Sequence, residues 1–152
     1  MPTGTARVVA GDGEEVGHFR LLEHTADIGI EATGKSPADI FRAVAAGLRA
    51  VLGDLPNRPC GHWQQVSVEG RNLDELLVNW LNAILFHLEV DGLFPEQFRV
   101  EAISSTNLRA RIGGNLLADS PLPVREVKAA TWHRLEVSAQ PGGWRARVYL
   151  DL

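Results

Sequence analysis

The chain has a single cysteine and no long apolar run. One cysteine excludes an internal disulfide and suits a reducing compartment. No stretch approaches the roughly 20 apolar residues of a membrane-spanning helix, and the first residues lack the apolar core of a secretory signal peptide. These absences predict a cytoplasmic protein with no membrane partner. Cys60 lies in NRPCGHW, close to His62, but a lone cysteine without an orienting motif is more often structural than catalytic.

The motifs of several catalytic classes are also missing. The glycine-containing segments GDGEE and GGNLL lack the glycine spacing and the lysine of a phosphate-binding loop. GDGEE also lacks the frame of an EF-hand calcium loop. The chain contains neither a serine nucleophile elbow nor an HExxH zinc motif. The residues alone therefore yield no organised set of catalytic groups.

A strong positive charge is absent as well. The net charge of −4 argues against a protein that coats nucleic acid. The charge is uneven, because residues 1–97 carry 7 basic and 14 acidic side chains whereas residues 98–152 carry 8 and 5. Strand composition explains this difference, and a surface facing phosphate or an acidic partner is the alternative. The four tryptophans are scattered along the chain, a pattern that favours packing over base stacking.

Two segments have the pattern of amphipathic helices. In KSPADIFRAVAAGLRAVLGD, Ser36 is placed to cap a helix that begins at Pro37, and Gly53 is placed to end it. In RNLDELLVNWLNAILFHLEVDG, Asn72 is the expected cap and Gly92 the expected stop. Apolar residues recur at three- and four-residue steps in both segments, so each helix has an apolar stripe.

The other segments alternate like strands. DIGIEATG and WQQVSVEG each predict one strand, FRVEAISSTNLRARIGGNLL predicts a hairpin, and the QPGG turn near the end predicts a second hairpin. The expected fold is α+β, with two helices packed on a mostly antiparallel β-sheet assembly in the order ββαβαββββ. The length of 152 residues suits one domain. We expect residues 1–18 to be a flexible N-terminal extension and residues 19–152 to be the folded domain.

A polar cluster interrupts the segment LLEHTADIGIEA, where Glu23, His24 and Asp27 lie between two stretches that read as strands. A plain hairpin turn would use Asn-Gly or Asp-Gly instead. His24 and Asp27 are spaced to converge on one cation across the turn. The alternative is that Asp27 bonds its own backbone as an Asx-turn while Glu23 and His24 point to water.

The end of the chain is the second candidate. Asp151 lies in a final strand, WRARVYLDL, and Leu152 follows it directly, so we expect the Asp151 carboxylate and the terminal carboxylate to lie close together. Such groups repel unless a cation lies between them, and oxygen ligands favour hard cations; a solvated terminus is the alternative. Lys128, in EVKAATWH, is either a solvated strand lysine or a group that binds phosphate beside such a cation.

Three segments taken together, EHTADIGIEATGKSPADIFRAVAAGL, EVKAATWH and the terminal WRARVYLDL, resemble the archease family. The helix LDELLVNWLNAILFHLEVDG also fits that family. The resemblance covers Phe19 to Leu152 and implies a non-enzymatic accessory protein of the RtcB-type RNA ligase, which acts in tRNA splicing or RNA repair. The accessory protein would promote guanylylation of the ligase and multiple turnover, and it would meet RNA only indirectly, through the ligase.

The resemblance also implies site residues. A divalent cation, Ca²⁺ first with Mg²⁺ or Mn²⁺ as alternatives, would be held by Asp27, Asp151 and Leu152. Lys128 would act with the two aspartates in activating the ligase, and His24 and Glu23 would support the ligands without binding the ion themselves. No residue would be catalytic.

Two other functions stay open. A stand-alone, divalent-metal-dependent phosphoester hydrolase would need a base near a metal-bound water, and His24 is the obvious one. A chaperone-like protein-binding module would use the exposed strand edges of such a sheet.

Overall fold

The computed structural model describes residues 5–9, 15–23 and 27–152, and it describes no side chain at Glu23. The elements are β1 Ala6–Val9, β2 Glu15–Glu23, β3 Asp27–Gly34, α1 Pro37–Leu52, β4 His62–Glu69, α2 Leu73–Asp91, β5 Leu93–Ile103, β6 Asn107–Leu116, β7 Ala129–Gln140 and β8 Gly143–Asp151. In the described part of the chain, no helix combines the length and the apolar character needed to cross a bilayer.

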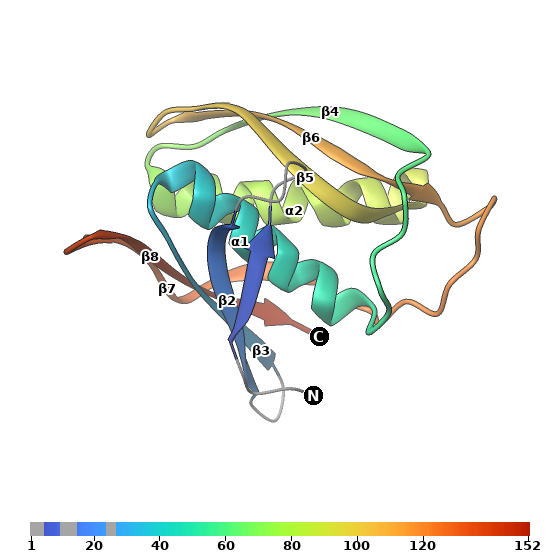
Figure 1. The fold of residues 1–152 in the computed structure, drawn as a ribbon, viewed down its shortest axis with the longest axis horizontal. Helices are drawn as coiled ribbons and strands as arrows, with labels where there is room; N and C mark the ends of the chain where they lie inside the picture. Colours follow the sequence, from blue (N-terminus) through green and yellow to red (C-terminus); the bar gives the residue numbers. More distant parts are fainter. Residues whose placement is uncertain (1–4, 10–14, 24–26) are drawn as a thin grey trace.

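The strands form two antiparallel sheets with the two helices between them (Figure 1). The five-stranded sheet has the order β1-β2-β3-β8-β7, and the three-stranded sheet has the order β4-β6-β5. Helix α1 packs mainly on β2, β3 and β5, and α2 packs on β7 and on all three strands of the smaller sheet. The predicted α+β class is confirmed, and each sheet turns one face to the helices and the other outward.

Both predicted helices form with the predicted ends. Ser36 Oγ accepts a hydrogen bond from the Asp39 N–H at 3.2 Å, and Asn72 Oδ1 accepts one from the Glu75 N–H at 2.9 Å. These bonds satisfy N–H groups that the first turn of a helix leaves without partners. Gly92 ends α2 in the left-handed region at φ 67°, where glycine is favoured because it has no Cβ.

The core lies between the sheets and around the helices. Alternate residues of β3 and β8, Ile28, Ile30, Val148 and Leu150 among them, point into it and are almost fully buried. At the centre the Trp80 indole N–H donates to the Phe41 carbonyl at 3.1 Å, which joins α2 to α1. The other alternate residues of β3 and β8, which include Asp27 and Asp151, therefore lie on the outward face of the five-stranded sheet.

Two stretches have features that the sequence did not indicate. Within the predicted N-terminal extension, Ala6–Val9 and Glu15–His18 are strand, and Ala6 pairs with Phe19. The pairing of β7 with β8 is irregular, because the register shifts between Thr131 and Glu136, and Arg134 has a positive φ of 54°.

Candidate functional site

The predicted site residues Asp27 and Asp151 lie side by side at one end of the five-stranded sheet. Asp27 is the first residue of β3 and Asp151 is the last residue of β8, and the antiparallel register pairs them directly. Directly paired residues have Cβ atoms about 4.5–5.5 Å apart and point to the same face. Folding thus brings together two carboxylates from opposite ends of the described chain.

Lys128 and Leu152 complete this group. The Lys128 N–H donates to the Asp151 carbonyl at 2.8 Å, and Ala129 pairs with Asp151 across the β7–β8 ladder. The Lys128 side chain is exposed, whereas Leu152 is half-buried and packs against the core. We call Asp27, Lys128, Asp151 and Leu152 the acidic corner.

The acidic corner has two features that suit a hard cation. Like charges directly opposite each other in a ladder destabilise the pair, so a positive ion near both Asp27 and Asp151 would offset a repulsion. Asp27 Oδ1 is buried and accepts no hydrogen bond from the part of the chain that the structure describes, which costs free energy unless another group or ion occupies the lone pairs. Carboxylate oxygens are the ligands that Ca²⁺ and Mg²⁺ prefer.

The two carboxylates alone do not complete a coordination shell. Among the described residues, no three His, Cys, Asp or Glu side chains converge, and Ca²⁺ takes about six to eight oxygens. The main chain of Leu152 and water would have to supply further ligands. Of the other two predicted residues, His24 lies outside the described residues, and for Glu23 only the backbone is described, paired with Ile28.

An aromatic pair that the sequence analysis did not single out lies beside the acidic corner. Tyr149 lies two residues before Asp151 on the same outward face of β8, and it pairs with Gly29 of β3 and Thr131 of β7. Its ring covers Gly29, where a Cβ would come within 2.8 Å of the phenol ring, and His133 packs edge-on against it at 5.8 Å. The residue pattern within a single strand does not predict this contact, because the contact depends on which strands are neighbours in the sheet.

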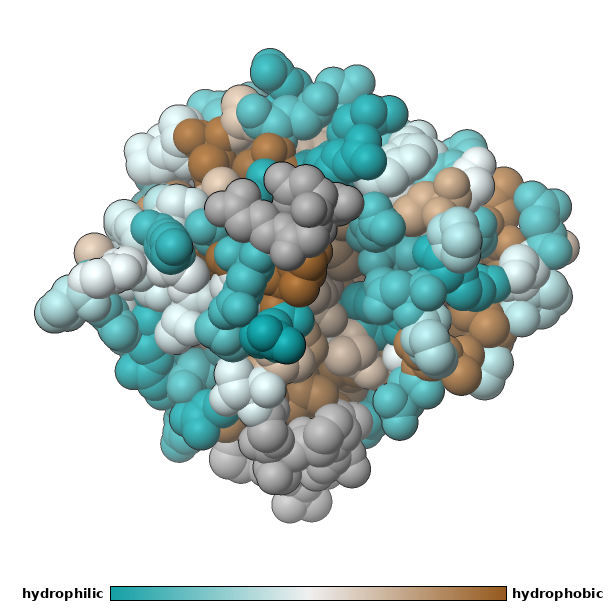
Figure 2. Space-filling model, in the orientation of Figure 1, coloured by the Kyte–Doolittle hydropathy of each residue, from teal (hydrophilic) through white to brown (hydrophobic). Residues whose placement is uncertain are grey.

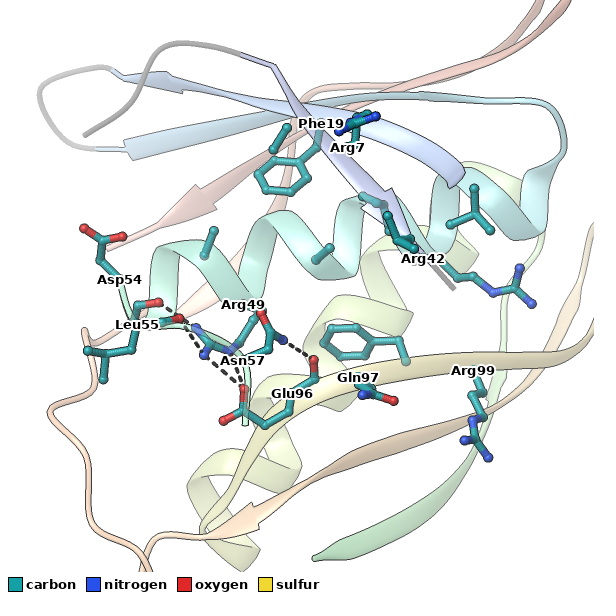
Figure 3. A pocket seen from close by; sticks show the side chains of 18 residues that line it. Arg7, Phe19, Arg42, Arg49, Asp54, Leu55, Asn57, Glu96, Gln97 and Arg99 are labelled. Atoms are coloured by element: carbon teal, nitrogen blue, oxygen red, sulfur yellow. Dashed lines mark hydrogen bonds and ion pairs between the residues drawn. The ribbon is translucent and has the colours of Figure 1, made fainter. Parts of the chain in front are cut away.

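A separate groove of about 940 Å³ runs along α1 between β1 and β5. Figure 2 shows a hollowed hydrophobic strip at the centre of this face. In Figure 3, Phe19 lies on one wall, and Arg49, Asn57 and Glu96 are joined by hydrogen bonds at one end. None of the four residues of the acidic corner lines the groove.

The polar end of the groove is a buried ion-pair network. The Arg49 guanidinium donates to Glu96 Oε1 at 3.2 Å through Nε and at 3.0 Å through Nη2, and Arg58 Nε donates to Glu96 Oε2 at 3.0 Å. Arg49 also holds the segment after α1 through the carbonyls of Gly53, at 2.6 Å, and Leu55, at 3.1 Å. A buried charge of this kind needs several partners, so the network fixes the loop after α1 onto β5.

Cys60 shows no sign of activation as a nucleophile. Burial raises the pKa of its thiol, the Glu96 carboxylate raises it further, and Arg99 acts in the opposite direction. A raised pKa leaves little thiolate at neutral pH, and the thiolate is the reactive form.

Comparison with known proteins agrees with this fold. Residues 19–152 match the sequence model of the Archease protein family. The archease of Methanosarcina barkeri is 31% identical over 88% of this chain and 95% of its own length, and that of Pyrococcus abyssi is 34% identical over 86% and 95%. The solution structure of Methanobacterium thermoautotrophicum protein 1598 superposes with a TM-score of 0.69 at 27% identity, covering 88% of this chain and 98% of that one.

The two-sheet fold and these comparisons place the chain among small α+β proteins, and here both helices lie between the two sheets. Within that class, the chain belongs to the archease family.

Proposed function

We propose that this protein is a metal-binding accessory protein of an RtcB-type RNA ligase, and that it promotes guanylylation of the ligase and multiple turnover. Family membership supports an accessory role in RNA processing at the level of the family. The observation that carries the proposal is the direct pairing of Asp27 with Asp151, because it gathers the acidic groups and Lys128 at one accessible end of a sheet.

Each residue of the acidic corner has a distinct task in this proposal. Asp27 and Asp151 would hold a divalent cation through carboxylate oxygens, with Leu152 adding a main-chain oxygen. The bound cation would supply a concentrated positive charge. Asp27 is half-buried, whereas Asp151 is exposed, so Asp27 would anchor the ion while Asp151 remains accessible to the ligase.

Lys128 would supply the mobile part of the site. Its backbone is fixed by the bond to the Asp151 carbonyl, while its exposed ammonium is free to reach a partner. An ammonium on a flexible stem is suited to phosphate, which it contacts as a point charge. We infer that Lys128 contacts a nucleotide phosphate while the ligase takes up its guanylate.

A multiple-turnover ligation assay tests the proposal. Substoichiometric ligase should turn over repeatedly with the wild-type protein and should stop after about one turnover with Asp27→Asn, Asp151→Asn or Lys128→Gln. Lys35→Gln is the matched control, because Lys35 is also exposed but precedes α1. The proposal fails if the three acidic-corner variants, shown by circular dichroism to be folded, support the same turnover as Lys35→Gln.

A further inference from the structure

The outward face of the three-stranded sheet carries an aromatic side chain among arginines. Trp63 on β4 pairs with Gly113 on β6, and Arg111 on β6 pairs with Arg99 on β5. Arg109 follows on the same face of β6, opposite Ser67. We call Trp63, Arg99, Arg109 and Arg111 the arginine–tryptophan face.

Close packing holds the indole of Trp63 flat on the sheet. A Cβ at Gly113 would come within 2.6 Å of the Trp63 ring, so only glycine leaves room for the ring to cross β6. The guanidinium carbon of Arg99 lies 4.2 Å from the centre of that ring, and that of Arg111 lies 5.4 Å from it. Both distances are in the cation–π range. The Trp63 ring and the two guanidinium groups therefore form one cluster on the outward face.

Two acids, Glu69 on β4 and Glu101 on β5, are exposed on the same sheet, but neither is paired with these arginines. In the described part of the chain, no carboxylate forms an ion pair with Arg99, Arg109 or Arg111. By contrast, Arg20 and Arg147 on the outward face of the other sheet pair with acids, Glu31 at 2.8 Å and Glu136 at 3.4 Å.

Arg99 and Arg111 face each other directly, and like charges in that position destabilise a sheet. The contacts with Trp63 offset part of that repulsion. An anion between the two guanidinium groups would offset more.

We propose that the arginine–tryptophan face binds a single-stranded polynucleotide. Bases stack on aromatic rings and on guanidinium planes, and the unpaired arginines would bind the phosphates between the bases. An exposed sheet face suits a single strand because its bases are free to stack, whereas a duplex hides them. The whole chain carries a net charge of −4, so the three arginines of this face would have to supply the attraction for phosphate locally.

This proposal goes beyond ligase activation. It also departs from the expectation that RNA meets the protein only through the ligase, and from the interpretation of the tryptophans as packing residues alone. Trp80 is fully buried, as that interpretation requires, but Trp63 is only half-buried and lies on the outward face.

Fluorescence anisotropy of the isolated protein with a labelled oligoribonucleotide of about 12 nucleotides tests the proposal. We expect a Kd of about 1–100 μM and similar binding of the same sequence as single-stranded DNA, with weaker binding of the duplex. Arg99→Gln/Arg111→Gln should weaken binding about tenfold or more and reduce the slope of log K against log salt by about 1.4. Trp63→Ala should weaken binding about tenfold with the salt slope unchanged, and Trp63→Phe should restore most of the affinity.

The matched control is Arg20→Gln/Arg147→Gln, which removes the same charge from the other sheet and should leave affinity nearly unchanged. The proposal is overturned if the wild-type protein does not bind the oligonucleotide, if both double variants lose affinity equally, or if the duplex binds as tightly as the single strand. Equal affinity for polyglutamate would assign the face to an acidic protein and would also overturn it. The ligase is absent from this assay, so its outcome is independent of the turnover experiment.

Discussion

The buried pair of Arg49 and Glu96 makes a quantitative prediction about stability. Arg49 is 4% exposed and Glu96 is 3% exposed. Arg49→Met keeps a side chain of similar length but removes the two bonds to Glu96 and the bonds to the carbonyls of Gly53 and Leu55. Glu96 then stays buried with Arg58 as its remaining ion-pair partner.

The expected loss in the free energy of unfolding follows from the Glu96 charge that stays buried. Removing one partner of a buried ion pair costs about 3–5 kcal/mol because the other charge remains in the interior. Arg58 still compensates part of the Glu96 charge, so we expect the lower end, about 3 kcal/mol. Against a total stability of about 5–15 kcal/mol for a domain, this loss is large enough to measure easily.

Urea unfolding at neutral pH measures the effect as a lower midpoint with an unchanged slope. The matched control is Arg42→Met on the same helix, since Arg42 is half-buried and makes a longer ion pair, 3.4 Å to Asp39. The control should cost about 1 kcal/mol or less. Adding Glu96→Gln to Arg49→Met should recover part of the loss, because it removes the buried charge. The reasoning is refuted if Arg49→Met costs no more than Arg42→Met.

Three further predictions concern the ion, the pH and the thiol. Ca²⁺ at about 100 times its Kd should stabilise the wild-type protein by about 2.7 kcal/mol in thermal unfolding but should not stabilise Asp27→Asn; an equal shift in both would place the ion elsewhere. Burial raises the pKa of Glu31, but the hydrogen bonds and charges of Arg145 and Arg20 outweigh it and hold that pKa below its usual value. Glu31 should therefore add stability above its unfolded pKa, and this contribution should disappear as the pH falls through its folded pKa. Glu31→Gln should be less stable than wild type at neutral pH, with the gap closing in acid; a constant gap would contradict this. Cys60, whose pKa is raised chiefly by burial, should react more slowly with iodoacetamide at neutral pH than a free cysteine, and an equal rate would refute that.

The helices could be predicted closely because their signals are local. Ser36 and Asn72 form the cap bonds that their positions indicated, and Gly92 ends α2 as expected. Such caps depend on residues within one turn of the helix, and the apolar stripes depend on the same short range. The segment Ala6–Val9 was not predicted as strand, because it becomes strand by pairing with β2.

Contacts between strands could not be obtained from the spacing of residues. Residue parity put Asp151 on the polar face of its strand, but the pairing with Asp27 requires β8 to lie beside β3. The resemblance to a family supplied that association, whereas the residues alone favoured a turn-forming role for Asp27. The contact of Trp63 with Arg99 likewise depends on the order β4-β6-β5, which no local pattern indicates.

The central claim, that the acidic corner activates an RNA ligase, is tested most directly by the rate of ligase guanylylation with labelled GTP, with and without this protein. The account predicts that the wild-type protein raises the rate, that Asp27→Asn and Asp151→Asn abolish the increase, and that Glu101→Gln retains it, because Glu101 is exposed on β5 of the other sheet. An equal increase with the wild-type protein and both aspartate variants would contradict it.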